Sequence, residues 1–359
     1  MRVLVVDDSA LMRCLLRECF AAEPEIEILT ARDGLDALSK LESFNPDVVT
    51  MDVNMPVMDG LTCLAEIMTV SPRPVVMLSS LGEAGALATL EALKLGAVDF
   101  ISKPIGTVSP DLRRIFPEIL RKVRAAAGIR VARAARLRKP AKPLTTDGAE
   151  PRKPAAIASF ARKAAGQFDL VLIGASTGGP KALESILFQL GPDFPVPILI
   201  AQHMSSRFTK VFAERLTQEG SLPVIEVTGP TELLAGAAYL AQGEADVLVS
   251  MRRKRLIAAS VPANLDRVWN PSVNRMVETA HACLPAKRLL AVLLTGMGDD
   301  GAAAMTRLHR DGGMTIAQSE ASSAIFGMPC ALIEARGADR IMDIDRIGAT
   351  LLRLVAPKS

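Results

Sequence analysis

Residues 1–9 read M-R-V-L-V-V-D-D-S, a short apolar run that ends directly in two aspartates. Similar runs, separated by longer segments with apolar positions three and four apart, lie at 25–29, 47–51, 74–78 and 98–101. Short strands that alternate with helical segments predict a parallel sheet with helices on both faces. The pattern resumes at 169–174, 196–201 and 289–294. We therefore expect a second α/β domain.

A basic stretch separates the two patterned regions. Residues 121–163 contain 13 Lys or Arg against two acidic residues, and the stretch is rich in Ala and Pro. Proline blocks continuous helix or sheet, so we expect a linker over 126–167 between a domain at 1–125 and a domain at 168–356. Such charge is typical of a solvated tether, and contact with nucleic acid or an anionic membrane is the less favoured alternative, because no recognition fold accompanies the charge.

Composition excludes several classes of protein. The 359 residues are 49% hydrophobic and include a longest apolar run of about six residues, far below the roughly 20 needed to cross a bilayer. The N-terminus turns acidic too early for a signal peptide, so we expect a cytoplasmic protein without membrane insertion. Aromatic residues make up 4%, which disfavours stacking on single-stranded nucleic acid. Five cysteines without a C-x-x-C pair indicate reduced, buried thiols.

Three carboxylates follow predicted strands of the first domain. Asp7 and Asp8 come after the first strand and Asp52 after the third, and the carboxyl ends of parallel strands meet at one edge. Carboxylates gathered there repel one another unless a hard cation lies among them, which suits Mg²⁺. Ser79 and Lys103 follow the fourth and fifth strands and can bind the oxygens of a phosphoryl group.

The first predicted domain resembles the receiver domain of two-component response regulators. The resemblance is carried by V-D-D-S, M-D-V-N-M-P-V-M-D-G, M-L-S-S and F-I-S-K-P. It implies a flavodoxin-like fold in which Asp52 accepts a phosphoryl group from a sensor histidine kinase. Mg²⁺ would be held by the three aspartates and the backbone carbonyl of Asn54. Ser79 and Lys103 would sense the phosphoryl group, and Phe100 would be the switch aromatic.

A serine in the second domain has the surroundings of a nucleophile. Residues 169–180 read D-L-V-L-I-G-A-S-T-G-G-P, a strand that runs into a glycine-rich turn and a helix. Ser176 lies in that turn, where backbone N–H groups and the positive helix terminus can stabilise an oxyanion. His203 follows the next strand and is the candidate base, whereas His281 and His309 lie in helical patterns.

The candidate acid lies at a third strand end. The segment L-L-T-G-M-G-D-D-G at 293–301 offers Asp299 and Asp300, which the residues alone do not separate. The order Ser, His, Asp differs from the order in α/β-hydrolases, but a triad is recognised by geometry and not by sequence order.

The second predicted domain resembles the catalytic domain of chemotaxis protein-glutamate methylesterases. The resemblance is carried by G-A-S-T-G-G-P, A-Q-H-M, F-T-K-V-F-A-E-R-L, L-T-G-M-G-D-D-G-A and I-A-Q-S-E-A-S-S-A-I-F-G-M-P. It implies a doubly wound parallel-sheet hydrolase with Ser176 as nucleophile, His203 as base and Asp300 as orienting acid. The backbone N–H of Met297, with Thr177, would form the oxyanion site.

The two resemblances together imply a phosphorylation-regulated hydrolase. Its reaction would be hydrolysis of glutamate methyl esters on methylated chemoreceptors, with release of methanol and with deamidation of receptor glutamines. Water would be the only cosubstrate, and the esterase reaction would need no cofactor. We further expect the unphosphorylated receiver to pack over the Ser176 cleft. The alternative is a response regulator whose second domain acts only as a partner-binding module.

Two segments depart from the family pattern. Residues 240–247 read L-A-Q-G-E-A-D-V, and residues 269–274 read W-N-P-S-V-N. Both border the cleft in the family, so we expect altered substrate contacts with little effect on the triad chemistry. Neutral drift in segments that touch nothing is the alternative.

Overall fold

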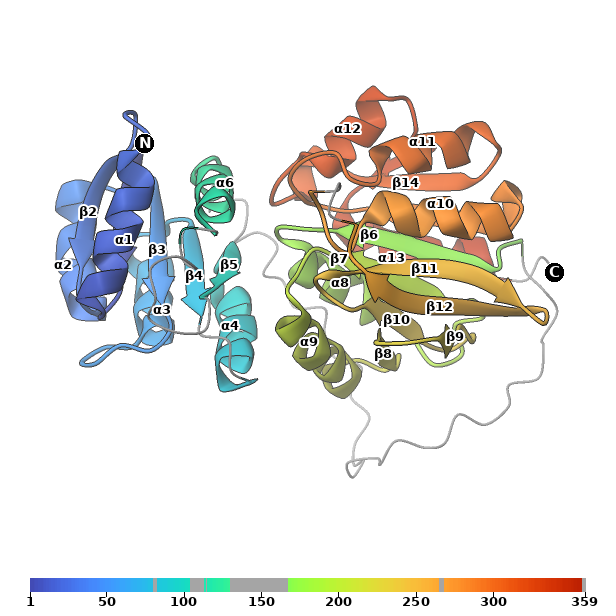
Figure 1. The fold of residues 1–359 in the computed structure, drawn as a ribbon, viewed down its shortest axis with the longest axis horizontal. Helices are drawn as coiled ribbons and strands as arrows, with labels where there is room; N and C mark the ends of the chain where they lie inside the picture. Colours follow the sequence, from blue (N-terminus) through green and yellow to red (C-terminus); the bar gives the residue numbers. More distant parts are fainter. Residues whose placement is uncertain (80–82, 104–112, 114, 130–166, 265–267, 357–359) are drawn as a thin grey trace.

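The computed structural model describes residues 1–79, 83–103, 113, 115–129, 167–264 and 268–356. These residues form two α/β domains that lie side by side (Figure 1). Most of the linker expected at 126–167 lies outside the described residues. Among the described residues, no helix has the length and apolar character needed to span a membrane.

The first domain is built on a five-stranded parallel sheet with strand order β2-β1-β3-β4-β5. Its strands are β1 (Arg2–Val6), β2 (Glu27–Ala31), β3 (Val48–Asp52), β4 (Val75–Ser79) and β5 (Asp99–Ser102). Its helices are α1 (Ala10–Ala21), α2 (Gly34–Phe44), α3 (Gly60–Val70), α4 (Glu83–Leu95) and α6 (Phe116–Ala127). This strand order is that of flavodoxin-like folds, which confirms the expected fold class.

Side-chain caps begin several of these helices. The carboxylates of Asp33 and Asp59 accept hydrogen bonds from backbone N–H groups in the first turns of α2 and α3, and the hydroxyl of Ser9 caps α1 in the same way. Each cap satisfies a backbone donor that the helix itself leaves without a partner. The strands β1, β3 and β4 are almost fully buried, as expected for a sheet covered on both faces.

The second domain contains a seven-stranded sheet with strand order β15-β14-β13-β6-β7-β10-β8, and every described pairing in it is parallel. Its strands are β6 (Leu170–Ala175), β7 (Ile198–Gln202), β8 (Val224–Val227), β10 (Ala238–Ala241), β13 (Leu289–Leu293), β14 (Met314–Gln318) and β15 (Arg340–Met342). Its helices are α8 (Gly179–Leu187), α9 (Ser206–Glu219), α10 (Val273–Cys283), α11 (Ala302–Arg310), α12 (Met328–Glu334) and α13 (Ile344–Val355). The three strands that the sequence predicts in this domain are β6, β7 and β13.

Helices cover both faces of this larger sheet. The buried side chains of α8, α9 and α13 belong to one apolar cluster, and those of α10, α11 and α12 belong to another. The doubly wound parallel sheet is therefore confirmed. Single 3₁₀ turns lie at Ala286–Arg288 and Glu320–Ser322.

A small antiparallel sheet in the second domain was not expected from the sequence. It consists of β9 (Thr231–Glu232), β11 (Ala245–Arg252) and β12 (Arg255–Pro262). β11 and β12 form a hairpin whose two turn residues, Arg253 and Lys254, both have positive φ angles of 48° and 65°. Such turns are usually recognised in a sequence by Asn-Gly. Because this turn contains Arg253 and Lys254 instead, the hairpin could not be predicted from the sequence.

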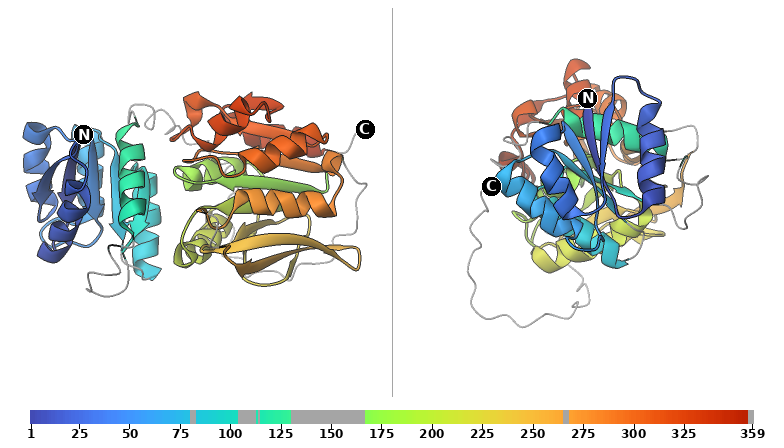
Figure 2. Two further views of the ribbon diagram at one scale, coloured as in Figure 1. Left: turned by 45° about the horizontal axis from the view of Figure 1, so that its top comes forward. Right: turned by 90° about the vertical axis from the view of Figure 1, so that its left-hand side faces the viewer.

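The two domains share an apolar interface. The first domain presents β5, α4 and α6 to the second (Figures 1 and 2), and α4 packs against α9. The rings of Phe100 and Phe208 lie 4.4 Å apart between their centroids, and both belong to one apolar cluster that continues from one domain into the other. An ion pair between Lys94 and Glu219, 2.6 Å between nitrogen and oxygen, adds to the contact.

Candidate active site and phosphoacceptor site

Ser176 and His203 follow neighbouring strands of the large sheet. The last residue of β6, Ala175, pairs in register with the last residue of β7, Gln202, so the next residue of each strand emerges at the same edge. The backbone N–H of His203 donates to the carbonyl of Ala175 at 3.0 Å. The side-chain amide of Gln202, at the end of β7, donates to the carbonyl of Ser176 at 2.9 Å and so holds the turn that follows β6. The strand pairing thus brings the predicted nucleophile and base together.

Asp300 lies against the histidine, whereas Asp299 does not. The Oδ2 atom of Asp300 lies 3.0 Å from Nε2 of His203 in a buried contact. Asp299 is exposed, and its backbone carbonyl accepts the N–H of Ala302 at the start of α11. The choice between the two adjacent acids, which the residues alone left open, therefore falls on Asp300 by geometry.

The carboxylate of Asp300 is fixed by the N-terminus of α10. Its two oxygens accept hydrogen bonds from the hydroxyl of Ser272 (3.1 Å) and from the backbone N–H groups of Val273 (2.6 Å) and Asn274 (3.0 Å). Burial raises the pKa of Asp300, but the hydrogen bond and charge of His203 and these backbone donors outweigh it, so the pKa lies below its ordinary value. Asp300 is thus held as an anion that can orient the imidazole.

The turn that carries Ser176 is closely packed. A Cβ atom at Gly296 would lie 2.6 Å from Cβ of Ser176, so only glycine allows the loop after β13 to approach the serine this closely. Ser176 is 6% exposed, and no hydrogen bond joins its hydroxyl to His203 among the described residues. The Nδ1 atom of His203 is buried without a hydrogen-bond partner. The nitrogen that would take the serine proton therefore has no hydrogen-bond partner among the described residues.

The two residues predicted for the oxyanion site flank the serine. Met297 follows Gly296 in the loop that touches Ser176, and Met297 is half-buried. Thr177 is buried next to the serine, but its hydroxyl donates a hydrogen bond of 2.5 Å to the carboxylate of Asp99 in the first domain. The first domain therefore reaches directly into this site and engages a side chain beside the nucleophile.

Trp269 and its neighbours reach the triad as well. The indole stacks on the imidazole of His203 with 5.0 Å between ring centroids and 8° between ring planes. Because Ser272–Asn274 hold Asp300, the segment 269–274 contacts the triad itself. It therefore does more than border the cleft, which argues against a segment that touches nothing. Our expectation that its departure from the family pattern has little effect on the triad chemistry stays a prediction. The segment 240–247 is joined to it, since buried Asp246 accepts hydrogen bonds from Arg275 (2.6 Å) and Ser272 N (2.9 Å).

The first domain gathers its three predicted carboxylates at one edge of the sheet. Oxygen atoms of Asp7, Asp8 and Asp52 all lie within 4.8 Å of one another, and Asp7 and Asp52 are buried. The Nζ atom of Lys103 lies 2.8 Å from a carboxylate oxygen of both Asp7 and Asp52. An all-oxygen donor set of this kind fits a hard divalent cation such as Mg²⁺. Asn54, which follows Asp52 by two residues in the sequence, is exposed.

The environment of Asp52 raises its pKa. Burial is the main cause, and the neighbouring Lys103 ammonium opposes it without cancelling it. The Oδ1 atom of Asp52 accepts the N–H of Val53 at 2.8 Å. A Cβ atom at Gly60 would lie 1.9 Å from the carbonyl oxygen of Asp52, so the glycine lets α3 begin directly against the end of β3.

The two predicted sensing residues on β4 and β5 differ in where they point. The hydroxyl of Ser79 donates to the carbonyl of Gly85 in α4 at 3.0 Å. Phe100 is buried against Phe208 of the second domain, and the ammonium of Lys122 lies 5.1 Å from the centre of its ring. The expected switch aromatic thus lies in the domain interface, while Lys103 lies in the acidic cluster.

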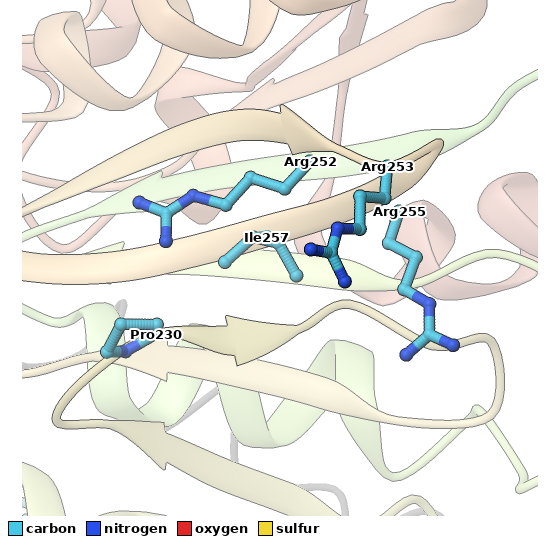
Figure 3. A pocket seen from close by; sticks show the side chains of 5 residues that line it. All are labelled: Pro230, Arg252, Arg253, Arg255 and Ile257. Atoms are coloured by element: carbon cyan, nitrogen blue, oxygen red, sulfur yellow. The ribbon is translucent and has the colours of Figure 1, made fainter.

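A separate basic pocket lies on the β11–β12 hairpin. It has a volume of about 390 Å³ and is lined by Pro230, Arg252, Arg253, Arg255 and Ile257 (Figure 3). The hairpin turn lies at the end of the second domain away from the first domain (Figure 1). The pocket contributes no residue to either site.

The fold and the two sites define a class of protein: a response-regulator receiver joined to an α/β domain of hydrolase type. Residues 3–113 match the response regulator receiver domain, and residues 171–351 match the CheB methylesterase domain. The chain belongs to the CheB methylesterase family.

Relatives match nearly the whole chain. A Rhodospirillum rubrum protein named protein-glutamate methylesterase/protein-glutamine glutaminase 3 is 50% identical over 98% of this chain and 95% of its own length. A Rhodopseudomonas palustris protein named protein-glutamate methylesterase/protein-glutamine glutaminase 2 is 50% identical over 98% of this chain and 97% of its own length. The crystal structure of the Thermotoga maritima CheB methylesterase catalytic domain is 32% identical, with a TM-score of 0.51, and covers 52% of this chain and 99% of that one.

Several residues that shape the site were missed by the sequence analysis. Asp99, Arg121 and Ser272 contact Thr177, Trp269 and Asp300 across the fold. No sequence pattern indicates the roles of Asp99 and Arg121, because both belong to the other domain. A sign for Ser272 was present, since a serine before an apolar helical pattern is a helix N-cap.

Proposed function

We propose that this chain hydrolyses glutamate methyl esters on chemoreceptors and deamidates receptor glutamines, under control of phosphorylation at Asp52. The observation that supports it most directly is the contact between His203 and Asp300 with Ser176 on the adjacent strand end. The names of the relatives, which match over nearly the full chain, point to the same two reactions. The proposed site of action on receptor helices is cytoplasmic.

Ester cleavage follows from the roles of three side chains. The Oγ atom of Ser176 attacks the ester carbonyl carbon while Nδ1 of His203 takes the hydroxyl proton. Asp300 stabilises the imidazolium that results. Collapse of the tetrahedral intermediate expels methanol, which takes the proton back from His203, and leaves the glutamate acyl group on Ser176.

A water molecule completes the reaction. His203 takes a proton from the water as it attacks the acyl group, and the glutamate carboxylate leaves as Ser176 regains its hydroxyl. The backbone N–H of Met297 and the hydroxyl of Thr177 would stabilise the oxyanion in both steps. A glutamine substrate follows the same course with ammonia in place of methanol.

The acidic cluster fits the role of phosphoacceptor site. A carboxylate oxygen of Asp52 attacks the phosphorus atom of the phosphohistidine of a sensor kinase, and the phosphorus–nitrogen bond breaks. Asp7, Asp8, Asp52 and the carbonyl of Asn54 would hold Mg²⁺, which neutralises the charge of the transferring phosphoryl group when bound. Lys103 lies between the acids and is placed to bind a phosphoryl oxygen.

The docked receiver supports an inhibitory role for the first domain. The carboxylate of Asp99 accepts the hydrogen bond of the Thr177 hydroxyl, so this donor is not available to the oxyanion while the receiver is docked. A negative charge at this place also opposes the negative charge that develops in the transition state. Phe100 lies in the same interface, so a change in its position on phosphorylation would weaken the docking. The boundaries of the domains at 1–125 and 168–356 are part of this proposal.

Methanol release from methylated receptors tests the enzyme assignment. We expect the Ser176→Ala protein to release no methanol above background, while Ser185→Ala, a serine on α8 outside the triad, retains the wild-type rate. Undiminished release by Ser176→Ala would leave only the alternative, a second domain that binds partners without catalysis.

A further inference from the structure

The single tryptophan of the chain lies against the candidate base. The indole of Trp269 is stacked on the imidazole of His203, nearly parallel to it. A Cβ atom at Gly298 would lie 2.7 Å from Cζ2 of Trp269, so the indole edge also packs against the loop that carries Asp300. The second domain thus holds the tryptophan on two sides.

The receiver supplies a third contact to the same ring. Arg121 lies on α6, and its Cζ atom is 4.2 Å from the ring centroid of Trp269. A guanidinium group over an indole is an attractive cation–π contact, and it strengthens where water is excluded. Arg121 is partly buried in the interface. An arginine of the first domain is therefore joined, through one aromatic ring, to the catalytic histidine of the second.

Among the described residues, the imidazole of His203 lacks a hydrogen bond at one of its two nitrogens. One edge of the imidazole is held by Asp300 and one face by Trp269, while the buried Nδ1 atom has no hydrogen-bond partner. A buried polar atom without a partner is unfavourable and marks a position in which the surroundings hold the ring. In the proposed reaction Nδ1 takes the proton of the Ser176 hydroxyl, and no hydrogen bond joins these two groups among the described residues.

We propose that Trp269 is a positioning residue through which the receiver controls His203: the docked receiver holds the indole on the imidazole through Arg121, and withdrawal of Arg121 releases the ring to engage Ser176. The proposal rests on the proposed function and adds a second level to it. The receiver does not only cover the cleft but also sets the geometry of the base.

The indole also provides the measurement, because emission from a single tryptophan reports this site alone. Withdrawal of Arg121 changes the surroundings of the indole, so we expect beryllofluoride with Mg²⁺, a mimic of phosphorylated aspartate, to shift the emission of the full-length protein. Arg121→Gln removes the cation and should give the shifted emission without beryllofluoride. Arg121→Lys keeps a cation and should retain the wild-type emission.

Rates on methylated receptors test whether this contact matters for catalysis. We expect the unphosphorylated Arg121→Gln protein to release methanol at least fivefold faster than wild type, about 1 kcal/mol. Arg124→Gln is the matched control, because Arg124 lies on the same helix but pairs with Glu23 and Glu25 within the receiver. It should change neither rate nor emission. Trp269→Phe keeps a ring on His203 and should retain most of the regulation, whereas Trp269→Ala should lose it.

Two results would overturn the proposal. One is wild-type emission and rate in Arg121→Gln; the other is shifted emission in Arg121→Gln with an unchanged rate, which would make the stack a docking contact only. Failure of the proposed function has a different signature, since wild-type protein would then release no methanol with or without beryllofluoride while the emission measurement still reports the contact.

Discussion

Two buried carboxylates, Asp52 in the receiver and Asp300 in the second domain, lie in similar places, but their pKa values are shifted in opposite directions. Both are at most 6% exposed near the carboxyl end of a parallel sheet. Burial raises the pKa of Asp52 with partial opposition from Lys103, whereas hydrogen bonds hold the pKa of Asp300 below its ordinary value despite burial.

The number of donors explains the difference. Among the described residues, Asp52 receives Val53 N on one oxygen and Lys103 on the other. Each oxygen of Asp300 receives two donors, from His203 and three donors at the start of α10. A carboxylate with free lone pairs can attack a phosphoryl group, and one whose lone pairs are all occupied can only orient its neighbour. Burial alone therefore does not predict what an aspartate does.

The largest expected effect comes from breaking the set of donors around Asp300. Asp300→Asn replaces an acceptor of the His203 N–H by a group that can present the wrong hydrogen-bonding face. We expect kcat for methanol release to fall by about 10³ to 10⁴, as for loss of the orienting acid in other triads. Asp299→Asn is the matched control at the exposed neighbour and should stay near wild type. Equal losses in the two variants would contradict the geometric choice of Asp300.

The second largest effect is expected from a substitution of Asp52. Asp52→Asn cannot form an acyl phosphate, so we expect phosphodonor to produce no increase in methanol release, against an increase of about tenfold or more in wild type, about 1.4 kcal/mol. Basal activity should remain, because Asp52 contacts no residue of the triad. The measurements are phosphoryl transfer from the kinase and methanol release with and without it. Activation of Asp52→Asn by the phosphodonor would show that the phosphoacceptor lies elsewhere.

A third carboxylate connects the two regions, and its effect is smaller. Asp99→Asn removes the charge that accepts the Thr177 hydroxyl, so the unphosphorylated protein should release methanol about three- to tenfold faster, about 0.7–1.4 kcal/mol. Glu118→Gln is the control, because Glu118 on α6 shares Lys122 with Asp99 but its side chain is 41% exposed, against 8% for Asp99. An unchanged rate in Asp99→Asn would mean that its contact with Thr177 does not restrain the enzyme.

The smallest effect is on stability, where the two aspartates should again differ in sign. The lowered pKa of Asp300 adds stability above the ordinary carboxyl range, which is lost as the pH falls through the native pKa. The raised pKa of Asp52 favours its protonated form, so that contribution is present at acid pH and is lost as the pH rises. Without Mg²⁺, Asp52→Asn should therefore stabilise the protein at pH 7, on the order of 1 kcal/mol in urea unfolding, and much less at pH 4.

Asp300→Asn should destabilise at pH 7, with a smaller loss at pH 4. Two variants with the same pH dependence would show that the ionisation of these carboxylates does not govern stability in this range.

Much of this arrangement follows from local sequence patterns. Apolar runs located the five strands of the first domain and β6, β7 and β13 of the second, but not β8, β10, β14 and β15. The residues directly after these runs placed Asp52, Ser176 and His203, because strand ends in a parallel sheet share an edge. The β11–β12 hairpin was missed, since its turn uses Arg253 and Lys254 and lacks a glycine. A two-residue turn with positive φ angles can be recognised in a sequence only when it contains the preferred residues, such as Asn-Gly.

The contacts between the domains could not be predicted in this way. Asp99 reads as a strand residue of the receiver, and Arg121 as one cation in a basic stretch. Their partners, Thr177 and Trp269, are far away in the sequence, and the contacts depend on how two finished domains pack. The contact of α10 with Asp300 likewise required the fold, although the N-cap at Ser272 was visible.

The apolar cluster that continues from Phe100 into Phe208 has a consequence for how the protein melts. Because buried surface is shared across the interface, the docked domains form one cooperative unit, and heat should unfold them in a single calorimetric transition. If phosphorylation undocks the domains as proposed, we expect two transitions in place of one, with Phe100 and Phe208 exposed to water. We therefore expect the phosphorylated protein to self-associate more readily than the unphosphorylated protein, because the apolar surface between the domains would then be exposed.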